Sequence, residues 1–197
     1  MNNKCFSIIF SLVILSILCN AFLSCSKNDS EDSTNEEETK SLAYDFAMKN
    51  NDGITIYYRV INEGSELEVR SKGDGIEHYK GKIEIPEDVT YKNRLYKVTR
   101  IGNHAFAGCD ELTSLTIPNS MKSFELQCFS GCENLNKIIV HDVATICGIK
   151  KFDADAEPFL YARLYSDDNT EIENLVIPNH VTTIEDAAFA NCSSIKT

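Results

Sequence analysis

The stretch from Ile101 to Pro118 reads IGNHAFAGCDELTSLTIP, and related stretches return further along the chain. The second reads FELQCFSGCENLNKIIVH and begins at Phe124, an offset of 23 residues (124 minus 101), and a third, IEDAAFANCSSIKT, begins at Ile184. A period of about 20 to 29 residues with recurring aliphatic and Asn or Cys positions is typical of leucine-rich repeats, in which each unit forms one coil of a solenoid.

Each recurring position has a physical interpretation. Alternating apolar residues in Leu115–Ile117, Ile138–Val140 and Leu175–Ile177 predict short strands of a parallel stack. The phenylalanine fills the coil behind the strand. Because Gly and Asn tolerate a positive φ, the residue before each repeat cysteine predicts a left-handed turn at Gly108, Gly131 and Asn191. We expect these residues to form the repeat core: Phe106, Cys109, Leu112, Leu115, Ile117, Phe129, Cys132, Leu135, Ile138, Val140, Leu175, Ile177, Ile184, Phe189 and Cys192.

These residues resemble the BspA-like leucine-rich repeats of bacterial surface antigens, whose units carry an I-G-x-x-A-F-x-G-C-x-x-L-x-x-L-x-I-P pattern. The resemblance covers about Ile83–Thr197, and Ile101–Pro118 matches almost position for position. The second copy departs at Phe124, Glu125 and Cys128, which predicts less regular packing of Ser120–Phe124. The resemblance implies a β-rich solenoid, a right-handed leucine-rich-repeat superhelix with short helical turns.

Two segments do not fit the repeat. In residues 41–98, Thr55–Val60 and Leu67–Ser71 alternate like paired strands, with a Gly-rich turn at Lys72–Gly75, so we expect an N-terminal β cap over the stack. Residues 99–197 hold the repeats, interrupted by an insert at 141–173 that also resembles family members. Five residues follow Cys192, whereas nine separate Cys109 from Pro118, so we expect a C-terminally truncated chain.

The amino terminus predicts export and lipidation. Residues 1–24 combine one early Lys with an uncharged, largely apolar run, as in a signal peptide. Cleavage before Cys25 resembles processing of bacterial lipoproteins, which lipidate that cysteine. The alternative is an uncleaved anchor, since Cys5–Cys25 could just span a bilayer. Residues 25–40 are acidic, lack aliphatic side chains and predict a disordered tether, and the Lys and acids after Cys25 resemble a signal for the outer face of the outer membrane.

The net charge of −11 argues against nucleic acid as a partner, because phosphate binding needs clustered cations. It also leaves the acyl chains as the credible membrane attachment. We therefore expect a membrane contact through the N-terminal lipid and a protein or glycan ligand.

The sequence offers no strong catalytic or metal-binding motif. His141, Asp142 and Cys147 could bring a base near a thiol, but no Gly-rich turn or oxyanion donor accompanies them. The acidic segments Asp153–Glu157 and Asp167–Asn169 follow neither calcium-loop nor zinc spacing. Lys72–Asp74 resembles a tripeptide recognised by some integrins, although a hairpin turn explains it. We predict that the protein is not an enzyme and needs no cofactor or metal.

Five cysteines remain after Cys25: Cys109, Cys128, Cys132, Cys147 and Cys192. Stacked coils would place repeat cysteines within disulfide reach, but they also suit a role as small buried apolar side chains.

The resemblance supports a surface-displayed binding scaffold or adhesin for protein ligands. The alternative is a structural or glycan-binding accessory lipoprotein of an outer-membrane complex, for which exposed aromatics such as Tyr161 and Tyr165 on a binding face would argue.

Overall fold

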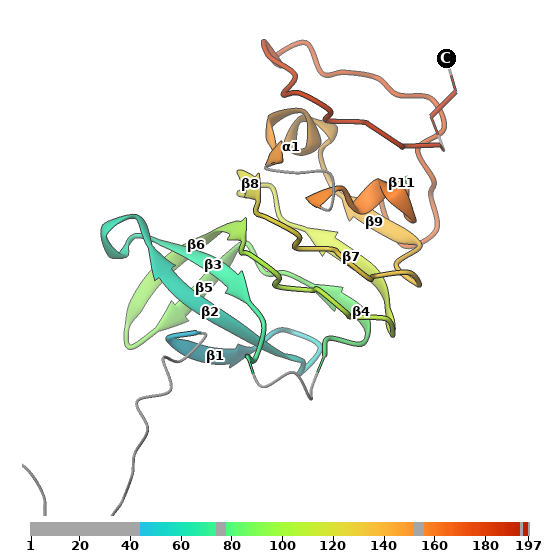
Figure 1. Cartoon of the computed structure of the whole chain (residues 1–197). Helices are drawn as coiled ribbons and strands as arrows, with labels where there is room; N and C mark the ends of the chain where they lie inside the picture. Colours follow the sequence, from blue (N-terminus) through green and yellow to red (C-terminus); the bar gives the residue numbers. More distant parts are fainter. Residues whose placement is uncertain (1–43, 74–77, 152–155, 194, 197) are drawn as a thin grey trace, which may run out of the picture. The chain divides into compact units, whose positions relative to one another are not determined.

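A computed structural model describes residues 44–73, 78–151, 156–193 and 195–196, all within one compact unit, Lys40–Thr197. The unit is a β-solenoid: successive coils stack and contribute parallel strands to two sheets (Figure 1). The expected signal peptide, Cys25 and the tether at 25–40 lie outside the described residues. Within the described residues, no helix has the length and apolar character needed to cross a bilayer.

Up to Tyr165 each coil gives one short strand to each sheet, and the described residues after it form no further strand. In the first sheet the parallel coil strands are β6 (Arg94–Ile101), β8 (Ser123–Phe124) and β10 (Lys150–Lys151). In the second sheet they are β4 (Gly81–Glu84), β7 (Leu112–Ile117), β9 (Lys137–Val140) and β11 (Arg163–Tyr165). Figure 1 shows β4, β7 and β9 rising through the stack in chain order.

Three strands that are antiparallel to one another extend the first sheet at its N-terminal side, and the last of them pairs in parallel with β6. They are β1 (Phe46–Lys49), β2 (Thr55–Ile61) and β3 (Glu66–Arg70), with the turn η1 (Asn62–Gly64) between β2 and β3, and β5 (Asp88–Tyr91) pairs with β6. β2 and β3 pair as expected for Thr55–Val60 and Leu67–Ser71. Strand β4 falls inside the segment expected to form the cap, but it pairs in parallel with β7, so the coils begin by Gly81.

The segment 141–173, expected to interrupt the repeats, supplies part of a coil. It holds α1 (Val143–Gly148), β10, the turn η3 (Pro158–Leu160) and β11, and its two strands join the two sheets. The expected strand at 175–177 does not form. The free edge of β11 is occupied instead by the returning chain, where Tyr165 bridges Glu171 and the Ile172 N–H donates to the Leu164 carbonyl at 2.8 Å.

The repeat positions line one core through the stack. The rings of Phe106 and Phe129 lie parallel, 5.8 Å apart, and Tyr79 from the cap side packs 4.8 Å from Phe106. The expected core residues of the first two copies are buried, as is Cys192. Ile184 differs, being 50% exposed, and Leu175, Ile177 and Phe189 are only half-buried. They belong to the outermost described coil, which has another coil on one side only.

The turn before each repeat cysteine is left-handed, as predicted, with φ of 71° at Gly108, 76° at Gly131 and 58° at Asn191. A second left-handed position lies four residues earlier and is filled by His104, Gln127 and Ala187. These turns stack as the strands do. The Phe106 N–H donates to the Cys128 carbonyl at 2.9 Å and the Gly108 N–H to that of Ser130 at 2.7 Å.

Candidate interaction surface

The second sheet presents ordered rows of side chains on the face opposite the core, which we call the outer face. The register aligns one row across β4, β7, β9 and β11: Lys82, Ser114, Lys137 and Arg163. The next row, which includes Leu115 and Ile138, points into the core. Because strand side chains alternate, the row after that faces outward again: Glu84, Thr116, Ile139 and Tyr165.

Three cations stand in the first outward row, and we call Lys82, Lys137 and Arg163 the basic row. They are gathered on one sheet face of a chain whose net charge is −11. Neighbouring strands lie about 4.8 Å apart, so the basic row spans about 14 Å from β4 to β11. Arg163 is already paired with Glu171, with Nη1 3.0 Å from Oε1, so Lys82 and Lys137 are the cations of the row that remain for other partners.

A loop after β11, residues 166–170, reaches over this row. The Ser166 N–H donates to the Thr170 carbonyl at 3.0 Å, and Asp167 Oδ1 accepts the N–H groups of Asn169 and Thr170, each at 2.8 Å. The bond from the Asn169 N–H is the main reason that the pKa of Asp167 lies below its ordinary value. The turn is therefore held by bonds within the loop itself.

The tip of the loop contacts two strands that are not neighbours. Asp168 Oδ1 lies 3.1 Å from Lys82 Nζ on β4, and the Asp168 backbone carbonyl accepts a hydrogen bond from Lys137 Nζ on β9. Strand β7 lies between β4 and β9, so the loop crosses the outer face. Lys137 Nζ also stands 4.5 Å from the centre of the Tyr165 ring.

Two side chains on the outer face of the second sheet are buried. Ser114 and Ile139 point outward by register, yet they are 3% and 5% exposed. Ile139 is not part of the main core cluster, although both Ile138 and Val140 are. The outer face around β7 and β9 is thus partly shielded from solvent, and Asp168 of the loop contacts the lysines on either side of β7.

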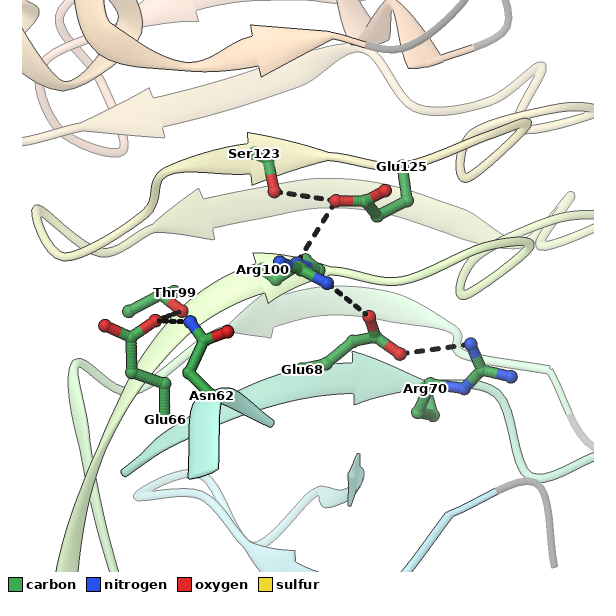
Figure 2. Close-up of polar contacts among 8 residues, drawn as sticks. All are labelled: Asn62, Glu66, Glu68, Arg70, Thr99, Arg100, Ser123 and Glu125. Carbon is green, nitrogen blue, oxygen red and sulfur yellow. Dashed lines mark hydrogen bonds and ion pairs between the residues drawn. The ribbon is translucent and has the colours of Figure 1, made fainter. Parts of the chain in front are cut away.

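A ladder of charges joins the first sheet across the boundary between cap and coils (Figure 2). Glu68 on β3 is buried and pairs with Arg70 at 3.1 Å and Arg100 at 3.6 Å, and Arg100 continues to Glu125 at 3.1 Å. The ladder accounts for one of the three departures of the second copy from the repeat pattern, the one at Glu125. Glu125 replaces Gly because it has a partner on the preceding coil, and β8 keeps its regular pairing.

A cavity of about 490 Å³ lies where the cap meets the turn of the first repeat. Its lining includes Tyr57, His78, Lys80 and His104. Lys80 pairs with Glu111 at 2.6 Å, and His104 Nε2 lies 2.9 Å from Gln127 Oε1. Residues 74–77, and with them Asp74 of the integrin-like tripeptide, lie outside the described residues.

The cysteines considered above are buried thiols. Burial raises the pKa of Cys109 to about 11 and that of Cys132 to about 12, and Cys132 Sγ donates to the Phe106 carbonyl at 3.0 Å. Cys147, the candidate nucleophile, is also buried, and burial raises its pKa. Asp142 caps α1 by accepting the Ala144 N–H at 2.8 Å.

No group of three or more His, Cys, Asp or Glu side chains in the described part of the chain is arranged to hold a metal ion. Asp153 and Asp155 of one acidic segment fall outside that part. In the other segment, Asp167 is engaged by its own loop and Asp168 by Lys82.

Sequence reasoning placed none of the outer-face cations together. They are separated by 55 and 26 residues (137 minus 82, and 163 minus 137) and meet only through strand register. Of the two tyrosines considered for glycan binding, Tyr165 lies on the outer face under Lys137, and Tyr161 is exposed in the turn before β11.

The family model described as BspA type leucine-rich repeat region matches residues 82–155 and 163–197, in six copies. No curated protein sequence matches significantly.

Three crystal structures are similar to this chain. A leucine-rich repeat protein from Bacteroides capillosus is 18% identical, with 60% of this chain and 96% of that chain covered and a TM-score of 0.39. A leucine rich cell surface protein from Faecalibacterium prausnitzii is 20% identical, with 78% and 42% covered and a TM-score of 0.38. A leucine-rich repeat protein from Bacteroides ovatus is 24% identical, with 78% and 40% covered and a TM-score of 0.35. The chain thus spans less than half the length of the latter two.

Proposed function

This chain belongs to the BspA-type leucine-rich-repeat family, and on that premise we propose that it is a binding scaffold for a protein ligand, displayed on the bacterial cell surface by a lipid on Cys25. The proposal includes no enzymatic activity and no cofactor. The observation that carries it is the outer face of the second sheet, where four coils align charged, polar and aromatic side chains in register.

A protein ligand suits this face better than a glycan. Sugars bind through the open faces of aromatic rings, and the Tyr165 ring on this surface already has the Lys137 ammonium over it. The rows present charged and small side chains at the spacing of neighbouring strands, and an extended protein segment can contact side chains at this spacing. We therefore keep the glycan-binding accessory role as the second candidate function.

Surface display is supported by the amino-terminal sequence, with its apolar run and a cysteine followed by an acidic tether. Metabolic labelling with a palmitate analogue tests it. Cys25→Ser should abolish labelling, whereas Cys19→Ser, which changes another cysteine of the same segment, should retain it. Protease treatment of intact cells should release the folded unit. Labelling that survives in Cys25→Ser would contradict lipidation at this residue.

Site-specific photo-crosslinking tests the binding face. A photoreactive amino acid at Glu84 would point outward from β4, and the same group at Thr90, an exposed residue of β5, serves as the control. We expect the displayed full chain, offered separate matrix proteins and polysaccharides, to form a discrete protein adduct from position 84 and not from 90. Equal adducts from both positions would contradict the assignment of the face, and a polysaccharide adduct alone would favour the accessory role.

A further inference from the structure

The loop 166–170 gives the basic row the same groups that an acidic peptide would give it. Asp168 presents a side-chain carboxylate to Lys82 and a backbone carbonyl to Lys137. An extended acidic segment carries these two acceptors at every acidic residue. The loop thus occupies the outer face as a ligand of that chemistry would.

We propose that the outer face binds an acidic, extended segment of a partner protein, and that loop 166–170 covers this site until the ligand displaces it. The inference rests on the proposed function as a protein-binding scaffold and names the chemistry of its ligand.

The contacts that hold the loop down are weak enough to exchange. The Lys82 and Asp168 side chains are 68% and 57% exposed, and ion pairs between exposed side chains contribute only about 0.2 to 1 kcal/mol. The turn around Asp167 is bonded within the loop, so it can lift as a unit while keeping its shape. Lifting it would cost little and would uncover the face.

Charge and geometry select the ligand. Lys82 and Lys137 stand on strands two spacings apart, about 10 Å, which an extended peptide covers with about three residues at about 3.3 Å each, while Arg163 keeps its pair with Glu171. The surrounding chain has a net charge of −11, and at physiological ionic strength its repulsion is screened beyond about 8 Å, so an acidic segment is attracted where the cations are close. Ile139, now buried, would form an apolar floor beside it.

Fluorescence anisotropy of the full chain with a labelled ten-residue glutamate peptide tests the inference. Asp168→Ala should raise the affinity about twofold to fivefold, because the competing contact is lost. Asp186→Ala, an exposed aspartate of the last coil, makes the same charge change and should leave the affinity unchanged. Lys82→Glu should weaken binding, whereas Lys97→Glu, an exposed ion-paired lysine of β6, should not. In the Lys82→Glu background, Asp168→Ala should have no effect.

Hydrogen exchange adds a structural readout, since peptide binding should increase exchange in 166–170 and decrease it in β9. Equal effects of Asp168→Ala and Asp186→Ala would overturn the covering role of the loop. Absence of peptide binding to both wild type and Asp168→Ala would overturn the acidic ligand, as would preferential binding of an anionic polysaccharide. The proposed function would survive either result if position 84 still forms its protein adduct, so the two failures are distinguishable.

Discussion

Gly102→Ala should destabilise the protein through a single side chain, Glu68. A Cβ added at Gly102 would lie 2.6 Å from Glu68 Cδ and 2.7 Å from both Cγ and Oε1. Real contacts of this kind do not occur, so Glu68 must leave its place between Arg70 and Arg100. Gly102 is absent from the residues with positive φ, so alanine brings no backbone strain of its own.

The magnitude follows from two terms. Forcing an extra carbon into a packed site costs about 1 to 3 kcal/mol, and hydrogen bonds to charged groups contribute about 1.5 to 3 kcal/mol when buried. Arg100 is one-third exposed and keeps Glu125, so the second term is largely reduced. We expect Gly102→Ala to lower the free energy of unfolding by about 2 kcal/mol.

The effect of Gly102→Ala should depend on whether the Glu68 side chain is present. With Glu68→Ala already present, the clash is gone, and Gly102→Ala should be neutral or stabilise the fold by up to about 1 kcal/mol, because alanine restricts the unfolded chain. Urea unfolding of the four proteins, followed by circular dichroism and tyrosine fluorescence, gives the coupling energy, which we expect to be about 2 kcal/mol. An equal loss of stability from Gly102→Ala with and without Glu68→Ala would show that the added methyl group does not act through Glu68.

Other parts of the core give further expectations. Burial raises the pKa of Cys109 to about 11 and that of Cys132 to about 12, so both thiols should resist alkylation at pH 8 until the protein unfolds. Peptide mass spectrometry measures this labelling, and rapid labelling of the native state would contradict their burial. The folded state binds these protons more tightly than the unfolded state, so the free energy of unfolding should fall as pH rises from 9 towards 11. Lys151→Met should lower the free energy of unfolding in urea by about 3 kcal/mol, because it leaves the charge of Glu157 buried without a counter-charge. The double variant Lys151→Met with Glu157→Leu should recover most of this loss. No recovery would mean that the lysine acts through other contacts.

The coil core could be predicted because its chemistry repeats at a fixed interval. Phe106 and Phe129 occupy the same position in successive coils. Gly108 and Gly131 indicate the left-handed turn because glycine tolerates a positive φ. The second left-handed position was missed because His104 and its counterparts carry ordinary side chains. Gln127 and Ala187 are residue types that seldom adopt a positive φ, so the recurring position carries no shared signal in the sequence.

The coil inside the expected insert was hidden for a related reason. Lys150–Lys151 and Arg163–Tyr165 have no apolar alternation of useful length, and they join the sheets through backbone pairing with β8 and β9. Deleting 141–173 would therefore remove two strands of the stack, which is why single substitutions in the loop are the better test of binding. The outer face was hidden because cations far apart in sequence meet only once the register is known.

If the repeated positions meet as successive layers of one core, the rings of Phe106 and Phe129 must show nuclear Overhauser contacts with each other. At a centroid separation of 5.8 Å with nearly parallel rings, we expect clear contacts between their ring protons, and between those of Tyr79 and Phe106 on the cap side. Rings that show contacts only to unrelated residues, with none to each other, would contradict it.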